Sequence, residues 1–148
     1  MSLKDRVNED MKAAMRARET GRLSAIRLLL AAIKQKEVDE RIEADDAQVI
    51  AVVDRLLKQR RDSIEQFEAA GRRDLADQER AEAEVLAAYM PQQASEAEVA
   101  AEIDAALAAT GASGPRDMGR VMAVLKGRLA GRADLTAVSA SVKARLAG

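Results

Sequence analysis

Arg, Lys, Asp and Glu are the side chains through which this chain could do chemistry, because it contains neither His nor Cys. Serine and cysteine nucleophiles usually depend on a histidine base, and zinc sites depend mainly on His and Cys ligands. Both kinds of site are therefore excluded, as are disulfides and redox thiols. No glycine-rich loop leads into Lys-Ser or Lys-Thr, which excludes a phosphate-loop NTPase. We expect no independent catalysis, no cofactor and no metal.

Basic side chains are concentrated near the end of the chain, directly after an acidic segment. Residues 111–148 contain 7 Lys or Arg and 2 acidic residues, whereas residues 95–110 contain 4 acidic residues and no basic one. The whole chain is nearly neutral, with 24 basic and 25 acidic residues. This asymmetry indicates either a surface for an anionic partner or ordinary variation of surface charge.

A helix predicted over residues 117–129 has a nearly bare face. Gly119, Ala123 and Gly127 are four residues apart, so they share one side of the helix. A helical Gly costs about 0.8–1 kcal/mol relative to Ala, so this pattern favours close approach of a ligand or of another helix to the backbone. A phosphate backbone and a tightly crossing neighbouring helix both fit the pattern. The candidate nucleic-acid-binding residues are Arg116, Gly119, Arg120, Lys126, Gly127, Arg128 and Arg132.

The kind of nucleic acid is restricted by the scarcity of aromatic side chains. The chain has one Phe, one Tyr and no Trp. Proteins that bind single strands rely on aromatic side chains that stack on the bases. We therefore expect any nucleic acid bound here to be folded or double-stranded and to be recognised by its shape and phosphates.

Three cations outside this segment, Arg27, Lys34 and Arg60, form a possible anion or ion-pair site. Arg60 lies within the apolar stripe of the long third helix, so it must be paired or reach out of the packing. Arg27 and Lys34 follow the margin of the second helix, where an ordinary solvated edge is the simpler interpretation. The carboxylates that could pair with Arg60 are Glu79, Glu82 and Glu84.

The elements that must position these residues are all helical. Apolar residues recur at intervals of three and four, and no strand pattern is found. Gly21 is expected to follow the end of the first helix. The helices are predicted over residues 3–18, 22–38, 45–71, 74–89, 95–110, 117–129 and 135–146.

Pro91 marks the expected boundary between two small helical domains, because proline cannot continue a helix and moves the preceding residue out of helical conformation. Ser95 and Glu98 then form the pattern of a capping box. We predict an N-terminal domain of about four helices over residues 1–90, a linker over 91–94 and a three-helix C-terminal domain over 95–148.

The location of the protein is expected to be cytoplasmic. Residues 1–6 include charged side chains where a signal peptide requires an apolar stretch, and the longest apolar run is only Leu28 to Ile33. Neither export nor association with a membrane is predicted.

Several ordered motifs resemble those of the GatB/YqeY family, over essentially the whole chain. The chain looks like a free-standing YqeY-like protein. Its C-terminal half is similar to the tail domain of the B subunit of the glutamine-dependent tRNA amidotransferase. The motifs are Lys58–Ile64, Glu79–Glu84, Tyr89–Pro91, Asp117–Met122 and Gly131–Asp134.

This resemblance implies a two-domain, all-helical fold and a tail of the kind that engages tRNA while other domains do the chemistry. The chain has no counterpart of the amidotransferase's large ATP-dependent domain or of its amidase. Carbon–nitrogen ligase activity with glutamine as amido-N-donor would thus describe participation in a complex. The resemblance suggests a tRNA-facing set that consists of Arg116, Arg120, Lys126, Arg128 and Arg132.

The leading hypothesis is a non-catalytic adaptor that binds tRNA or a tRNA-containing amidotransferase complex. A second hypothesis is an amidotransferase component that contributes to carbon–nitrogen ligase activity and contacts the other subunits. A third is a helical protein-interaction module that binds no nucleic acid.

Overall fold

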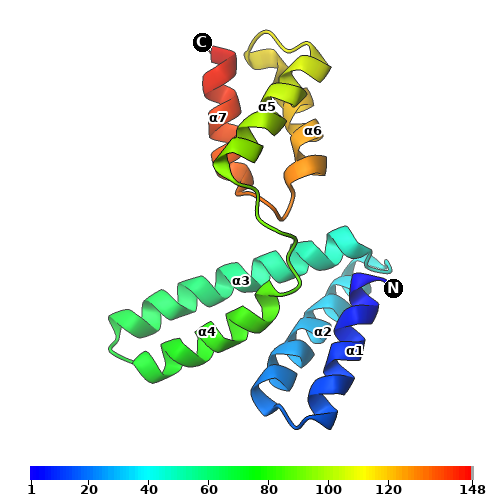
Figure 1. Cartoon of the computed structure of the whole chain (residues 1–148), viewed down its shortest axis with the longest axis vertical. Coiled ribbons are helices and arrows are strands. Elements are labelled where there is room, and N and C mark those ends of the chain that lie inside the picture. The colour runs from blue at the N-terminus through cyan, green and yellow to red at the C-terminus, as the bar shows by residue number, and fades with distance from the viewer. Residues whose placement is uncertain (148) are drawn as a thin grey trace. The chain divides into compact units, whose positions relative to one another are not determined.

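The computed structural model describes residues 1–147, so Gly148, the last residue of the predicted C-terminal domain, lies outside the described residues. The prediction of an all-helical protein is confirmed, because the described residues form helices, turns and loops and no strand (Figure 1). The helices are α1 (Leu3–Arg16), α2 (Thr20–Glu40), α3 (Asp46–Ala69), α4 (Arg73–Ala87), α5 (Glu96–Thr110), the 3-10 helix η1 (Pro115–Asp117), α6 (Met118–Leu129) and α7 (Leu135–Ala147).

The chain packs as two compact units, Met1–Met90 and a second from Pro91 onward. In the N-terminal unit, α1 pairs with α2 and α3 pairs with α4. Ser2 caps α1 by accepting a hydrogen bond from the Asp5 amide, and Asp45 caps α3 by accepting one from the Gln48 amide. The core of this unit includes Val7, Ile26, Leu29, Ile33, Val49, Val53 and Leu86.

The turn between α1 and α2 differs from the expectation that Gly21 follows the end of the first helix. Helix α1 already ends at Arg16, and Arg18 adopts the left-handed conformation with φ 57°. The Glu19 amide then bonds the Ala14 carbonyl, which closes the turn. Gly21 consequently lies inside the first turn of α2, and an arginine occupies the position that favours glycine.

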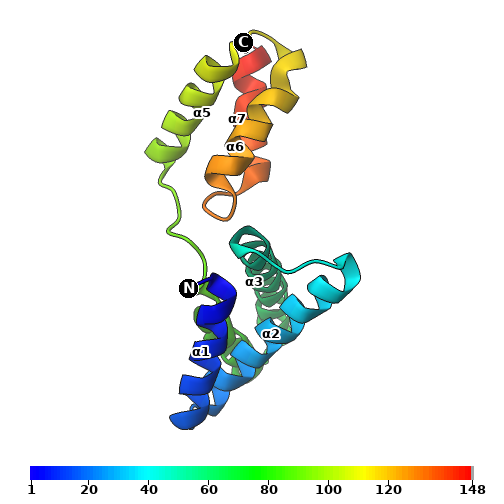
Figure 2. The same ribbon diagram turned by 90° about the vertical axis from the view of Figure 1, so that its right-hand side faces the viewer.

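In the C-terminal unit, α5 and α7 both pack against α6, and Figure 2 shows α6 and α7 side by side. The Ser95 hydroxyl caps α5 by accepting a hydrogen bond from the Glu98 amide. The Glu98 carboxylate does not complete the predicted capping box, because it accepts from Arg132 and from the Ser95 hydroxyl instead. The core of this unit includes Ile103, Val121, Leu125, Leu129, Val138 and Val142.

The helices of both units are too short or too polar to cross a lipid bilayer, as judged over residues 1–147. The described acidic side chains also form no group of three or more that could hold a metal ion.

Candidate nucleic-acid interface

Helix α6 carries the predicted bare face on its solvent side. Val121 and Leu125 of its apolar stripe are fully buried against the rest of the C-terminal unit. Gly119, Ala123 and Gly127 are exposed, and a Cβ added at either glycine would meet no heavy atom within 4 Å. No other described helix of the C-terminal unit crosses tightly at these glycines. Within the C-terminal unit this face of α6 is therefore uncovered.

Asp117 organises the start of α6. One of its carboxylate oxygens accepts hydrogen bonds from the amides of Ser113 and Gly114, at 2.9 and 3.3 Å, and the other accepts one from Arg120. The Ser113 amide, the Arg120 guanidinium and the Gly114 amide lower the pKa of Asp117 to about 2. Asp117 is therefore ionised at neutral pH and tied to the loop before α6.

Arg120 belongs to this loop as well as to the candidate interface. Besides the ion pair with Asp117, it donates a hydrogen bond to the Thr110 carbonyl at 3.2 Å. Its side chain nevertheless remains 61% exposed. A phosphate can reach this guanidinium, but it must compete with the Asp117 carboxylate.

Two other predicted arginines are paired with the acidic helix α5. Arg128 makes a bidentate pair with Glu102 at 2.7 and 2.9 Å, which lowers the pKa of that carboxyl. Arg132 donates to Glu98 at 2.9 Å and to the Gln92 carbonyl at 3.1 Å. These two predicted site residues connect α5 to α6 and to the loop that follows α6.

The acidic segment therefore neutralises much of the basic segment. Three of the four carboxylates of α5 are paired with arginines, the third pair being Asp104 with Arg145 at 2.6 Å. Among the described residues, Arg116 and Lys126 are the predicted interface cations that form no ion pair, and both are exposed. The strongest free positive charge of the candidate interface thus lies at Arg116 and Lys126.

The second predicted site is divided between an ion pair and open surface. Arg60 on α3 lies with its Nε 3.1 Å from Glu79 and 3.0 Å from Glu82, and its side chain is 14% exposed. Arg27 and Lys34 on α2 are exposed, and the Arg27 guanidinium contacts the Met15 sulfur at 3.6 Å. Arg60 is therefore held within the packing of α3 against α4.

The structure also shows features that the sequence reasoning missed. The Tyr89 hydroxyl donates to Asp10 at 2.6 Å, and the Arg6 guanidinium lies 5.1 Å from the centre of the Tyr89 ring. An open groove lies between α5 and α7. The polar Tyr-Asp contact joins residues 79 apart, and the groove depends on how the helices splay, so neither leaves a local signal in the sequence.

Comparison with known proteins gives one family match. A family model described as "Yqey-like protein" matches residues 4–146. The chain is 38% identical over 100 residues to the Lachancea thermotolerans protein named "Altered inheritance of mitochondria protein 41, mitochondrial". The aligned region covers 66% of this chain and 54% of that protein. A protein of the same name from Eremothecium gossypii is 39% identical over 104 residues, which covers 68% of this chain and 57% of the relative. The chain spans about half the length of these curated relatives.

These relatives correct the expected location. Their names describe mitochondrial proteins, as does the name of a Saccharomyces cerevisiae relative that is 38% identical over 84 residues, or 56% of this chain and 45% of that protein. By this comparison the prediction of a cytoplasmic protein is wrong. That prediction depended on the lack of an export signal and a membrane span, and neither feature distinguishes one aqueous compartment from another.

Proposed function

The chain belongs to the YqeY-like protein family, and from this membership we propose that it is a non-catalytic adaptor that binds folded tRNA through its C-terminal unit. The similarity of Gly119–Met122 and Gly131–Asp134 to the amidotransferase tail domain supports tRNA as the ligand and links the adaptor to that enzyme. The absence of His and Cys from the sequence supports a binding role over a catalytic one.

The open face of α6 is the observation that carries this proposal. Gly119 and Gly127 leave the helix backbone unobstructed, and the exposed cations Arg116, Arg120 and Lys126 accompany that face. A phosphate backbone fits such a surface because it is narrow, anionic and bound chiefly through Lys and Arg.

The ion pairs of α5 determine which arginines are free to bind a phosphate. Arg128 and Arg132 already have carboxylate partners, so a phosphate gains less by contacting them than by contacting an unpaired cation. We therefore assign the main phosphate contacts to Arg116 and Lys126, with Arg120 as a contact that exchanges between Asp117 and the RNA.

Titration of the full chain with folded tRNA over a series of salt concentrations tests this proposal. The double variant Arg116→Glu/Lys126→Glu should bind at least about tenfold more weakly. Its salt dependence should also fall, by about 0.7–0.9 in slope for each lost phosphate contact. The matched control is Arg27→Glu/Lys34→Glu, which makes the same change of charge on α2. Wild-type affinity of the first variant, or equal weakening of both, would rule the interface out.

A transamidation assay tests the link to the amidotransferase. We propose that the purified chain increases the rate of glutamine-dependent transamidation in a reaction reconstituted without it. The Arg116→Glu/Lys126→Glu variant should lose this effect while it retains its helical content by circular dichroism. An unchanged rate on addition of wild-type protein would remove the amidotransferase from the proposal but would leave tRNA binding intact.

A further inference from the structure

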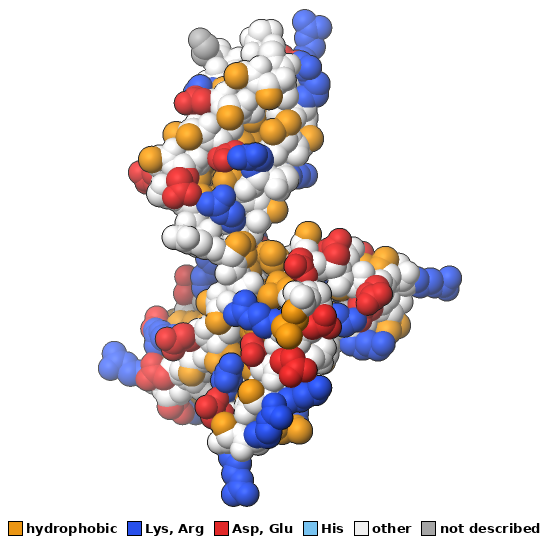
Figure 3. All heavy atoms as spheres, turned by 45° about the vertical axis from the view of Figure 1, so that its right-hand side comes forward, with side chains coloured by type: hydrophobic (Ala, Val, Ile, Leu, Met, Phe, Trp, Pro, Cys, Tyr) orange, Lys and Arg blue, Asp and Glu red, His pale blue; other side chains and the backbone are white. Residues whose placement is uncertain are grey.

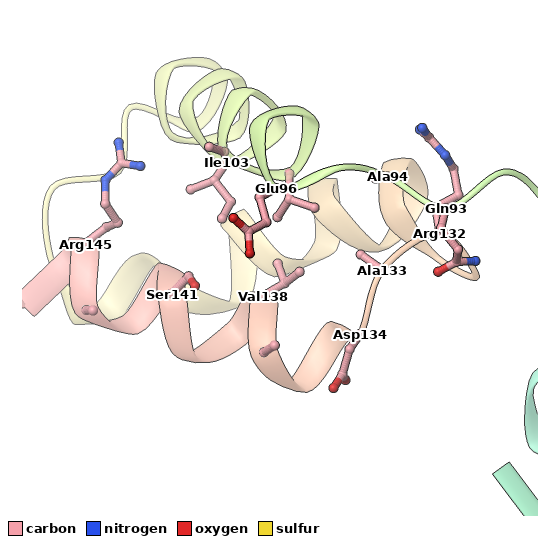
Figure 4. A pocket seen from close by; sticks show the side chains of 14 residues that line it. Gln93, Ala94, Glu96, Ile103, Arg132, Ala133, Asp134, Val138, Ser141 and Arg145 are labelled. Atoms are coloured by element: carbon pink, nitrogen blue, oxygen red, sulfur yellow. The ribbon is translucent and has the colours of Figure 1, made fainter. Parts of the chain in front are cut away.

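The C-terminal unit has an apolar groove between α5 and α7, with a volume of about 820 Å³ (Figure 4). Both helices pack on α6, and their first turns lie at the same end of the groove. The nearly buried side chains of Ile103 and Val138 line it together with Val99. Alanines line much of the remainder, namely Ala94, Ala100, Ala133, Ala137 and Ala144.

The unpaired charges of this groove are negative. Glu96 and Asp134 both line the end of the groove where α5 and α7 begin, and within the described residues neither takes part in an ion pair. Arg132 and Arg145 also line the groove, but they are paired with Glu98 and Asp104. Figure 3 shows hydrophobic, acidic and basic side chains interspersed on one face of the C-terminal unit. An RNA phosphate would be repelled by the two free carboxylates.

The shape of the groove suits a helix. The lining residues run from Glu96 to Ile103 on α5 and from Ala137 to Arg145 on α7, so the two helices line the groove for about 12 Å, or roughly two turns of an incoming helix. The small side chains of the alanines allow another helix to approach closely, and the apolar floor would bury its hydrophobic face. Because Ile103 and Val138 are already only 3% exposed, the surface that a third helix would cover belongs mainly to Val99 and to the alanines.

We propose that this groove is the docking site for an amphipathic helix of a partner protein that places Lys or Arg beside Glu96 and Asp134. The charge of the groove selects a basic helix, and the apolar floor supplies the buried contact. No residue of α6 lines the groove, so this site is separate from the open face of α6 and does not depend on RNA binding.

Two synthetic peptides of about 15 residues provide the probe. Both place Leu at positions i, i+3, i+4 and i+7, and they differ only in carrying two Lys or two Glu residues at the end that meets Glu96 and Asp134. Titrated into the isotopically labelled full chain, the Lys peptide should bind with a Kd on the order of 10 µM and at least about tenfold more tightly than the Glu peptide. Its chemical-shift changes should cluster on α5 and α7.

Variants of exposed groove residues separate docking from misfolding. Ala137→Glu and Ser141→Glu should each abolish binding of the Lys peptide, because they place a carboxylate over the apolar floor. Ala123→Glu, on the open face of α6, is the matched control and should bind like the wild type. All three positions are exposed on helices, so native spectra are expected for each variant.

The role of the two carboxylates is tested by the double variant Glu96→Gln/Asp134→Asn. The Asp134 carboxylate accepts a hydrogen bond from the Thr136 amide at the start of α7, and Asn preserves this cap. The variant should bind both peptides with nearly equal affinity, since the apolar contact remains and the charge preference is removed.

In the peptide titrations, four results would overturn the proposal. They are no binding of either peptide, equal affinity of the wild type for both, shifts confined to α6, and unchanged binding by Ala137→Glu. A dimer of the free chain that Ala137→Glu dissociates would also overturn it, by showing a second copy in the groove. Protection of groove residues by tRNA would overturn it in favour of RNA.

Discussion

At the scale of single residues, Tyr89 of the N-terminal unit is buried and contacts two charged side chains. It is 4% exposed, its hydroxyl donates to the Asp10 carboxylate, and Arg6 lies over its ring. Burial first, and the hydrogen bond to Asp10 second, raise the pKa of Tyr89 far above its usual value of about 10. The phenol therefore stays protonated and joins the end of α4 to α1.

Removing this hydroxyl should destabilise the N-terminal unit. We expect Tyr89→Phe to lower the free energy of unfolding in urea by about 1–2 kcal/mol, because the half-buried Asp10 loses a charge-assisted hydrogen bond. Asp10→Asn, which keeps an acceptor oxygen, should lose less. Unchanged stability of Tyr89→Phe would show that water replaces the hydroxyl without cost.

The pKa of Asp117 predicts a local response to acid. Its folded pKa of about 2 lies below the usual value of about 3.9, so its stabilising effect is complete above pH 4 and is lost as the pH falls toward 2. In an NMR titration, the Ser113 and Gly114 amide signals should move with a midpoint near 2, and Asp117→Asn should remove this transition. A midpoint near 4 would contradict the hydrogen bonds from the Ser113 and Gly114 amides to the ionised carboxylate.

At the scale of elements, α6 contains two glycines, Gly119 and Gly127, which have low helix propensity and pack against no other side chain of the described residues. Gly127 has helical backbone angles and open space around it, so Gly127→Ala should stabilise the chain by about 0.5–1 kcal/mol in urea unfolding. Gly127→Leu should also fold well, but its bulk should weaken tRNA binding if RNA lies against this face. Undiminished tRNA binding by Gly127→Leu would show that the bare face is not the contact.

The pairing of α5 with its neighbours is also a property of whole elements. The sequence shows an acidic helix before a basic segment, which suggests separated charges. The structure instead brings Glu98 to Arg132, Glu102 to Arg128 and Asp104 to Arg145. Side chains 26 to 41 residues apart meet because α6 and α7 return alongside α5. The apparent basic patch is therefore smaller than its charge count indicates.

At the scale of the whole molecule, the two core clusters share no residue. Leu29→Ala and Leu125→Ala each remove a fully buried side chain from a different cluster, at an expected cost of about 2–5 kcal/mol. In hydrogen exchange, each variant should lose protection only in the unit that contains it, as expected for the predicted domains 1–90 and 95–148. Equal loss of protection in both units would indicate a single cooperative domain.

The local pattern of the sequence determined the helical class, most helix positions and the buried faces of α3 and α6, because the period of apolar residues and the capping side chains act within a few residues of one another. It also identified Arg60 as either an anion site or an ion-pair partner of acidic residues on the next helix. Only the tertiary structure decided which cations remain free, that Glu79 and Glu82 hold Arg60, and that α5 and α7 splay to form a groove. Those features depend on side chains that are distant in the chain and meet only after the helices have packed, so no local pattern encodes them.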